Sequence, residues 1–196
     1  MAVFDIQDIS SAQLNRCRAL CNALMQYQAK QSHKHTEILA AMHFENRLKP
    51  SFESAQHKKL LLAHCAGKAV GYAYANTYEM EEDGRYFVPD FLQAIYQEGQ
   101  LVFYPDSQQL PATIGVFNNL YVLPEHQGKG LGRQLSLSIM KWLQQSGTSD
   151  LYVYVSNGNE EKAVPFYESL GFSYSHSVLD GFITAFHQSN ANAAVL

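Results

Sequence analysis

The sequence lacks any apolar run close to the roughly 20 residues that a helix needs to cross a bilayer. Its first ten residues, MAVFDIQDIS, lack the basic and apolar regions of a secretory signal peptide. Basic residues are not clustered, and a net charge of −4 does not fit a general nucleic-acid binder. We therefore expect a cytoplasmic protein that binds neither a membrane nor nucleic acid.

Cysteine is also scarce, and Cys17, Cys21 and Cys65 are the only three in the sequence. Cys17 and Cys21 are four residues apart, a spacing that would place both thiols on one face of a helix. No second pair completes a metal site, and the eight histidines are dispersed. We interpret the cysteines as buried thiols, and we expect no metal.

The composition that remains is typical of a globular protein, with 46% apolar and 16% charged residues in a chain of 196. A chain of this length buries roughly two thirds of its unfolded surface without help from a disulfide or a metal. We predict a single domain over residues 1–190, interrupted by an insertion at about 80–112 and followed by a short tail at 191–196.

The spacing of apolar residues predicts the secondary structure. In chain order, we expect a strand at 3–6, a helix from Ser10 with a capping box to Gln13, a second helix at about 36–48 that stops at Pro50, a hairpin around Gly67, the insertion, a strand at 113–123, a helix at 131–146, a strand at 151–155, a short helix ending at Gly171, and strands at 174–179 and 182–187. This order predicts an α+β or α/β-type domain built around one mixed sheet.

A glycine-rich loop, Gln127 to Gly132, lies between a predicted strand and a predicted helix. The first N–H groups of a helix lack internal partners and point at an incoming anion, and glycines let the backbone come close to phosphate oxygens. Lys129 and Arg133 add positive charge. The spacing fits neither the nucleotide P-loop nor the dinucleotide fingerprint. The loop is either a phosphate site of another kind or a tight turn.

Two segments resemble motifs of the GNAT superfamily of N-acetyltransferases. NNLYVLPEHQGKGLG is similar to the acetyl-CoA signature Q/R-x-x-G-x-G/A, which Gln127, Gly130 and Gly132 match. AVPFYESLGF resembles a second family segment, A-x-x-F-Y-x-x-x-G-F, from Ala163 to Phe172. The clear resemblance covers residues 113–186, and a weaker one includes the hairpin at 70–73.

The resemblance implies the GNAT fold, a splayed mixed sheet flanked by about four helices. It also implies an acyltransferase that uses acetyl-CoA as cosubstrate and acetylates a primary amine of a small molecule, or a peptide amine, by direct attack in a ternary complex. Dimers are common in the family, so a homodimer stays open.

The same resemblance implies which residues bind the cofactor. The pantetheine arm would follow the strand, and the pyrophosphate would lie on the loop and the first turn of the helix. The residues concerned are Leu120, Tyr121, Val122, Gln127, Gly128, Lys129, Gly130, Leu131, Gly132 and Arg133.

One position departs from the family pattern. Many members have a cofactor-contacting asparagine three residues before the alanine that matches Ala163, and Glu160 stands there in this chain. Asn159 takes the role through a shift of one residue, or it only caps the helix. The other asparagine near this position is Asn157, two residues before Asn159.

Tyr167 has the spacing of the family's catalytic tyrosine, which implies a general acid that protonates the departing thiolate. The alternative is a tyrosine that completes the apolar face of a short helix. An amide of the strand between Leu120 and Val122 would polarise the thioester carbonyl as an oxyanion-hole donor does.

The general base is harder to assign. The inward positions of the strand are Val116, Asn118 and Asn119, and none of these accepts a proton at neutral pH. Glu79 acting through water, His126 and bulk water stay open as alternatives. The missing acid also supports a second function, a non-catalytic sensor that binds acetyl-CoA. A third function also stays open, that of a structural or partner-binding domain in which the glycine turn is incidental.

Acidic residues lead into the insertion, namely Glu79, Glu81, Glu82 and Asp83, with Tyr78, Tyr86 and Phe87 beside them. Acids next to aromatic rings suit a cationic acceptor. The alternative is a solvated charged turn.

Overall fold

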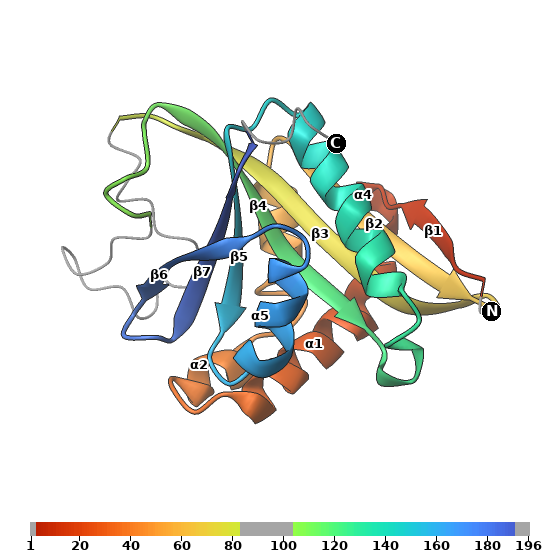
Figure 1. Ribbon diagram of the computed structural model, residues 1–196. Coiled ribbons are helices and arrows are strands. Elements are labelled where there is room, and N and C mark those ends of the chain that lie inside the picture. Colours follow the sequence, from red (N-terminus) through yellow and green to blue (C-terminus); the bar gives the residue numbers. More distant parts are fainter. Residues whose placement is uncertain (1–2, 83–103, 191–196) are drawn as a thin grey trace.

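The computed structural model describes residues 3–82 and 104–190, and its centre is one mixed sheet (Figure 1). The strands follow the order β1-β2-β3-β4-β5-β7-β6. Their bounds are β1 Asp5–Asp8, β2 Lys58–Cys65, β3 Lys68–Met80, β4 Ala112–Val122, β5 Asp150–Ser156, β6 Ser173–Val178 and β7 Ile183–Ser189. Neighbouring strands are antiparallel except for β4 and β5, which are parallel.

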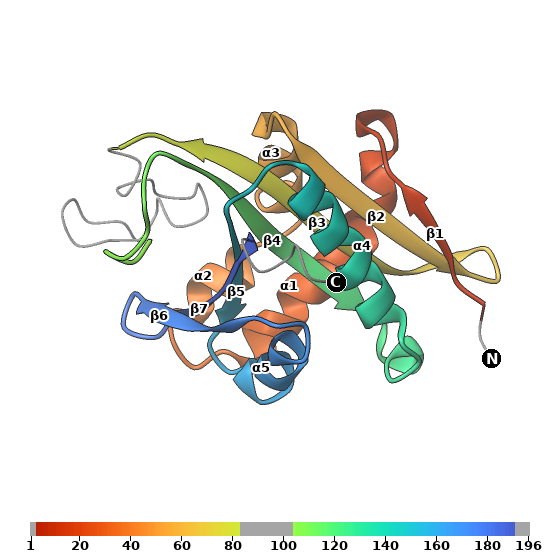
Figure 2. The ribbon, with the colours of Figure 1, turned by 45° about the horizontal axis from the view of Figure 1, so that its top comes forward.

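Helices cover both faces of this sheet. The α-helices are α1 Arg18–Gln31, α2 Thr36–Ala41, α3 Leu48–Ser54, α4 Leu131–Gln145 and α5 Glu160–Glu168, with 3₁₀ turns η1 Ser11–Cys17 and η4 Pro124–His126. α4 lies across β2, β3 and β4 on one face, whereas α1, α2 and α3 gather on the other (Figures 1 and 2). In the described ranges, no helix is long and apolar enough to cross a membrane.

The sequence predicted the α+β mixed sheet and the order of its elements correctly, but one helix was wrong. The helix expected at 36–48 ends at Ala41, and a separate helix, α3, begins at Leu48. Pro50 therefore lies in the first turn of α3, where a missing N–H is tolerated, and does not terminate a helix. Between the two helices, the amide of Phe44 donates to Asn22 Oδ1 of α1 at 2.8 Å. The described chain thus has five α-helices where about four were expected.

The predicted hairpin is confirmed. β2 and β3 are joined by Ala66 and Gly67, whose φ angles of 50° and 77° suit a two-residue hairpin turn. The capping box between Ser10 and Gln13 is also present, although the turns that follow it are 3₁₀. Most of the predicted insertion, including Asp83, Tyr86 and Phe87, lies outside the described residues.

The parallel strands β4 and β5 separate part of the way along. Ile114–Phe117 pairs with Asp150–Val153, after which β4 continues to Val122 and β5 to Ser156 without pairing to each other. Asn118 is an extra residue in β4, because Phe117 and Asn119 face consecutive residues of β3. This bulge lies at the point of separation, and Figure 1 shows the two strands diverging beyond it. The splayed sheet that the resemblance implied is present.

The end of β5 is fastened to the turn after α1. Asn157, which is only 1% exposed, accepts hydrogen bonds at Oδ1 from the amides of His33 and Lys34 at 2.8 and 2.9 Å. At Gly158, where φ is +79°, an added Cβ would stand 2.0 Å from the Gln31 carbonyl oxygen. Only glycine fits there, so this contact fixes where β5 ends relative to α1.

We expect Gly158→Ala to destabilise the protein far more than Gly67→Ala. Both glycines have nearly the same φ, so both alanines carry a similar backbone cost of about 1–2 kcal/mol. The Cβ at position 67 meets nothing within 4 Å, whereas the one at 158 forces α1 and β5 apart. Thermal unfolding should show a loss of a few degrees for Gly67→Ala and at least twice that loss for Gly158→Ala. Equal losses would contradict this account of the contact.

Candidate functional site

The glycine-rich loop ends at the N-terminus of α4. Gly128 and Gly130 have φ angles of 71° and 81°, which explains why glycine is needed at both. Because α4 begins at Leu131, the amides of Leu131, Gly132 and Arg133 have no acceptor inside the helix. Such amides, together with the positive end of the helix dipole, are suited to bind an anion.

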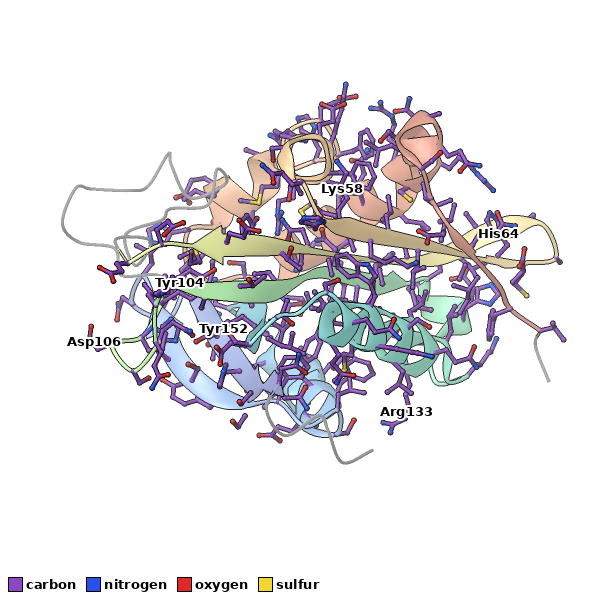
Figure 3. The ribbon with its side chains drawn as sticks, turned by 90° about the horizontal axis from the view of Figure 1, so that it is seen from above. Lys58, His64, Tyr104, Asp106, Arg133 and Tyr152 are labelled. Carbon is purple, nitrogen blue, oxygen red and sulfur yellow. The ribbon has the colours of Figure 1, made fainter. Side chains whose placement is uncertain are left out.

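Side chains hold this loop against the end of β4. Gln127 Nε2 donates to the Val122 carbonyl at 2.9 Å, and the Gln127 amide donates to the Pro124 carbonyl at 3.2 Å. Lys129 Nζ donates to the Glu125 carbonyl at 2.6 Å. The backbone N–H of Gln127 and one N–H of its side chain are therefore used inside the protein, which leaves the backbone N–H groups from Gly128 onward for a ligand. Arg133 projects from α4 (Figure 3).

The open edge of β4 presents two amides. The Leu123 amide donates to the Val70 carbonyl at 2.9 Å, so it points towards β3. Alternation along the strand then points the amides of Leu120 and Val122 to the opposite side, where β5 has separated. The backbone of Tyr121, by contrast, faces β3. Leu120 and Val122 thus offer free backbone N–H groups on the side where the pantetheine arm was expected, although the Val122 carbonyl is already bonded to Gln127.

Tyr167 lies on α5 beside the point of separation. Its ring is 9% exposed and packs edge-on against Phe117, the last β4 residue that pairs with β5, with ring centroids 6.0 Å apart. Burial raises the pKa of the Tyr167 phenol above its ordinary value. Among the described residues, no hydrogen bond to this hydroxyl is found. The neighbouring Phe166 is only partly buried and packs over Gly132, where an added Cβ would be 3.8 Å from its ring.

A cavity of about 570 Å³ opens at the same place, between the sheet and the helices of the N-terminal half. Its floor consists of residues from the two strands at their separation, namely Val116, Asn118 and Asn119 of β4 with Tyr154 and Ser156 of β5. Its walls come from α1, α2, the segment 46–57 and the start of β7. Tyr104, another lining residue, lies towards the opposite end of the strands from Arg133 (Figure 3).

The floor of the cavity is polar but uncharged. Asn118 Nδ2 donates to Asn76 Oδ1 and more weakly to the Val116 carbonyl at 3.4 Å. Asn119 is 4% exposed, and its Oδ1 has no hydrogen-bond partner in the described chain. Burial raises the pKa of the Tyr154 phenol well above its usual value. The predicted inward positions of β4 therefore line this cavity.

The acidic candidate for the general base lies at the edge of the cavity. Glu79 is exposed and lines the cavity together with Glu81, which is also exposed. His126 is not among the lining residues; it lies in η4, with its ring 6.1 Å from that of Phe4. The structure thus brings Glu79 near the predicted inward residues and keeps His126 away from them.

The two asparagines before α5 have different surroundings. Asn157 is committed to the turn after α1, as described above. Asn159 is the N-cap residue of α5, but its side chain makes no capping hydrogen bond. Its Nδ2 donates to Ser156 Oγ at 2.9 Å, and its buried Oδ1 has no partner in the described chain.

Two other features resemble sites but have structural explanations. Cys17 and Cys21 are both fully buried, and burial raises the pKa of Cys17 to about 12, so neither is a ready nucleophile. A second cavity of about 640 Å³ contains Asp150. Burial alone would raise the pKa of Asp150, but hydrogen bonds, above all that from His187 at 2.7 Å, hold it below its usual value. Both Asp150 oxygens are already bonded, which is typical of a structural network.

The sequence reading missed the part of the site contributed by Asn76 and by β5. Asn76 is 1% exposed in the middle of β3, a strand with an otherwise apolar and aromatic centre. An amide at a buried strand position was the signal that could have identified it. Tyr154 and Ser156 give no such signal, because Tyr154 lies within the apolar run of β5 and Ser156 directly follows it.

Comparisons with known proteins identify a family and a fold. The family profile described as "Acetyltransferase (GNAT) domain" matches residues 56–174. A mycothiol acetyltransferase from Paenarthrobacter aurescens is 38% identical over 94 residues, which is 44% of this chain and 28% of that protein. One from Nocardiopsis dassonvillei is 48% identical over 50 residues, or 26% of this chain and 15% of that protein. The chain thus matches less than a third of the length of these relatives.

Solved structures extend the similarity to the whole fold. The PaiA N-acetyltransferase from Thermoplasma acidophilum, in complex with coenzyme A, has a TM-score of 0.63 at 15% identity, covering 95% of this chain and 99% of its own. An aminoglycoside N-acetyltransferase in complex with CoA has a TM-score of 0.57 at 19% identity, covering 91% and 93%. With a family profile over more than half of its length and this fold, the chain belongs to the GNAT acetyltransferase family.

Proposed function

We propose that the protein is an N-acetyltransferase that transfers the acetyl group of acetyl-CoA to a primary amine of a small molecule. The observation that carries this proposal is the position of the β4–β5 separation, between an anion-binding helix terminus and a polar cavity. A cofactor that follows the open edge of β4 from the loop would bring its thioester to the cavity floor.

The names of similar proteins support a small-molecule acceptor. Relatives in sequence are called mycothiol acetyltransferases, and one structural neighbour is an aminoglycoside N-acetyltransferase with CoA bound. Because the sequence matches span only a minor part of those relatives, the activity of this chain rests on its own site.

In this proposal the pyrophosphate of acetyl-CoA lies on the amides from Gly128 to Gly132, with Lys129 and Arg133 adding positive charge. The pantetheine arm hydrogen-bonds to the free amides of Leu120 and Val122, as a further strand would. Gln127 holds the loop to the end of β4 through its hydrogen bond to the Val122 carbonyl. Asn159, whose side-chain oxygen has no partner in the described chain, is the asparagine nearest in sequence to the family's cofactor asparagine.

The chemistry is a direct substitution at the thioester carbonyl. The amine nitrogen forms a bond to the carbonyl carbon, the carbon–sulfur bond breaks, and the electron pair leaves with sulfur. An amide of the open β4 edge stabilises the oxyanion that forms in between. Tyr167 gives its proton to the leaving thiolate, and the nitrogen loses a proton to water, either directly or through a relay to Glu79. The phenol of Tyr167 is protonated at neutral pH, and burial raises its pKa further.

A non-catalytic acetyl-CoA sensor is the alternative, and it is favoured by the absence of a carboxylate or histidine at the inward positions of β4. Thiol release from acetyl-CoA with a panel of primary amines tests the enzyme. Release above the rate of spontaneous hydrolysis supports turnover. Binding of acetyl-CoA without any release would establish the sensor instead.

We expect Gly130→Val to raise the Kd for acetyl-CoA at least about tenfold, or roughly 1.4 kcal/mol. The added side chain would occupy the space where the pyrophosphate meets the loop. Gly147→Val, at the other end of α4, is the matched control, because its φ of +74° is close to the +81° of Gly130 and both positions are open within 4 Å. Calorimetry should show a loss of affinity in the first variant only. Equal affinity in the two variants would refute the loop as the phosphate site.

Tyr167→Phe should lower kcat by about 10²–10⁴ with little change in acetyl-CoA affinity. The phenylalanine ring keeps the contacts with Phe117 and Phe172, and no recorded hydrogen bond is lost. Tyr174→Phe serves as the control, since Tyr174 is 63% exposed and its hydroxyl lies outside the site. If Tyr167→Phe stayed within about threefold of wild type with chemistry limiting, the tyrosine would only pack.

A further inference from the structure

The hydrogen bonds on the floor of the cavity fix one carboxamide. Asn118 uses its Nδ2 to donate to Asn76 Oδ1 and the Val116 carbonyl. Its oxygen is then the remaining polar atom of the side chain, and no hydrogen bond to it is found in the described chain. Because Asn118 is the bulged residue at the point where β4 and β5 part, this oxygen belongs to the part of the floor that a thioester would reach.

Two neighbouring side-chain amides also have one polar atom without a partner in the described chain. Asn76 is 1% exposed with an unpartnered Nδ2, and Asn119 is 4% exposed with an unpartnered Oδ1. Leaving a buried polar atom without a hydrogen bond costs free energy, so the unpaired oxygen of Asn119, which lines the cavity, indicates that water or a polar ligand completes it.

The described cavity is also lined by four charged or titratable side chains other than tyrosine. They are Arg47, His57, Glu79 and Glu81, of which all but Arg47 are exposed. The phenols of Tyr78, Tyr104 and Tyr154 also line the cavity, and burial raises the pKa of the last two, so they stay uncharged at neutral pH. Glu79 pairs with Thr113, three residues or roughly 10 Å along β4 from Val116, and Glu81 follows the end of β3. An ammonium ion on the floor would therefore lose its hydration without a carboxylate in contact, whereas a neutral amine would carry no charge to desolvate.

We propose that Asn118, oriented by Asn76, accepts a hydrogen bond from the acceptor's amine, and that the site binds this amine as the free base rather than as the ammonium ion. The inference rests on the proposed function and deepens it. An amine bound as the free base already has the lone pair that attacks the thioester, so no carboxylate is needed at this point of β4. Asn118 is then a catalytic residue and Asn76 a positioning residue.

Binding can be measured without turnover by saturating the protein with CoA and titrating it with two probe amines by calorimetry between pH 6 and 10. Glycinamide carries an α-amine with a pKa near 8, and propylamine resembles the lysine amine with a pKa near 10.4. If the free base binds, affinity rises about tenfold per pH unit below the pKa of each amine, so it should level off near pH 8 for glycinamide and keep rising to pH 10 for propylamine. Affinity that is flat below the amine pKa and falls above it, or no binding of either amine, would overturn the inference.

Variants of the two asparagines test the residues themselves. Asn118→Leu keeps the side-chain volume and should weaken both amines about tenfold, with the Kd for CoA unchanged. Asn118→Asp supplies a counter-charge, so affinity at pH 7 should rise and no longer increase with pH. Asn76→Leu should weaken amine binding although Asn76 does not line the cavity, because it orients Asn118 through a hydrogen bond, and the pH dependence should keep the wild-type form. Asn15→Leu, on the exposed surface, is the control. Unchanged amine binding in Asn118→Leu would refute the assignment.

This design separates the inference from the function on which it rests. A protein that binds both amines as expected but releases no thiol from acetyl-CoA would refute N-acetyl transfer and leave Asn118 as the amine site. Thiol release from acetyl-CoA, together with amine binding that is unchanged in Asn118→Leu, would support N-acetyl transfer and refute Asn118 as the amine site.

Discussion

The constraint on which the site depends is the short length of the β4–β5 pairing. Only Ile114–Phe117 meets Asp150–Val153, and the bulge at Asn118 ends the ladder. Beyond it, the unpaired edge of β4 has amides with no strand to receive them, which is costly unless water or a ligand binds there. The glycine-rich loop, the N-terminus of α4 and the cavity can act on one ligand because each lies along this opening. On one face Tyr167 packs against Phe117, and on the other the asparagines form the floor.

Anchors on both sides keep the strands apart. On the α4 side, Gln127 ties the glycine loop to the Val122 carbonyl, which fixes the loop to the end of β4. On the other side, Asn157 and Gly158 hold the end of β5 against the turn after α1. If β5 moved towards β4, it would have to break the contacts of Asn157. The opening is therefore set by packing remote from the chemistry, so substitutions at these anchors should act on both cofactor and acceptor.

The sequence predicted the parts that local patterns determine. The glycine-rich loop combines positive φ angles at Gly128 and Gly130, the start of α4 and the family motif in one short segment. The order of strands and helices followed from apolar spacing. It failed where tertiary contacts decide. Pro50 ends a helix in isolation, but here Asn22 holds Phe44 and a new helix begins before the proline. The role of Asn76 could not be predicted from spacing, because it depends on a hydrogen bond with Asn118, which is 42 residues away in the sequence.

The missing acid on β4 has a physical interpretation that follows from the same contacts. A carboxylate at position 118 would attract the ammonium form and would itself need charge compensation in a partly buried place. A carboxamide held by Asn76 avoids both problems, but it leaves proton removal to the solvent before binding. Such a site works best on amines whose pKa lies near neutrality, since a larger fraction is already the free base. For strongly basic amines, the same floor would make deprotonation in solution the main limit on kcat/KM at pH 7.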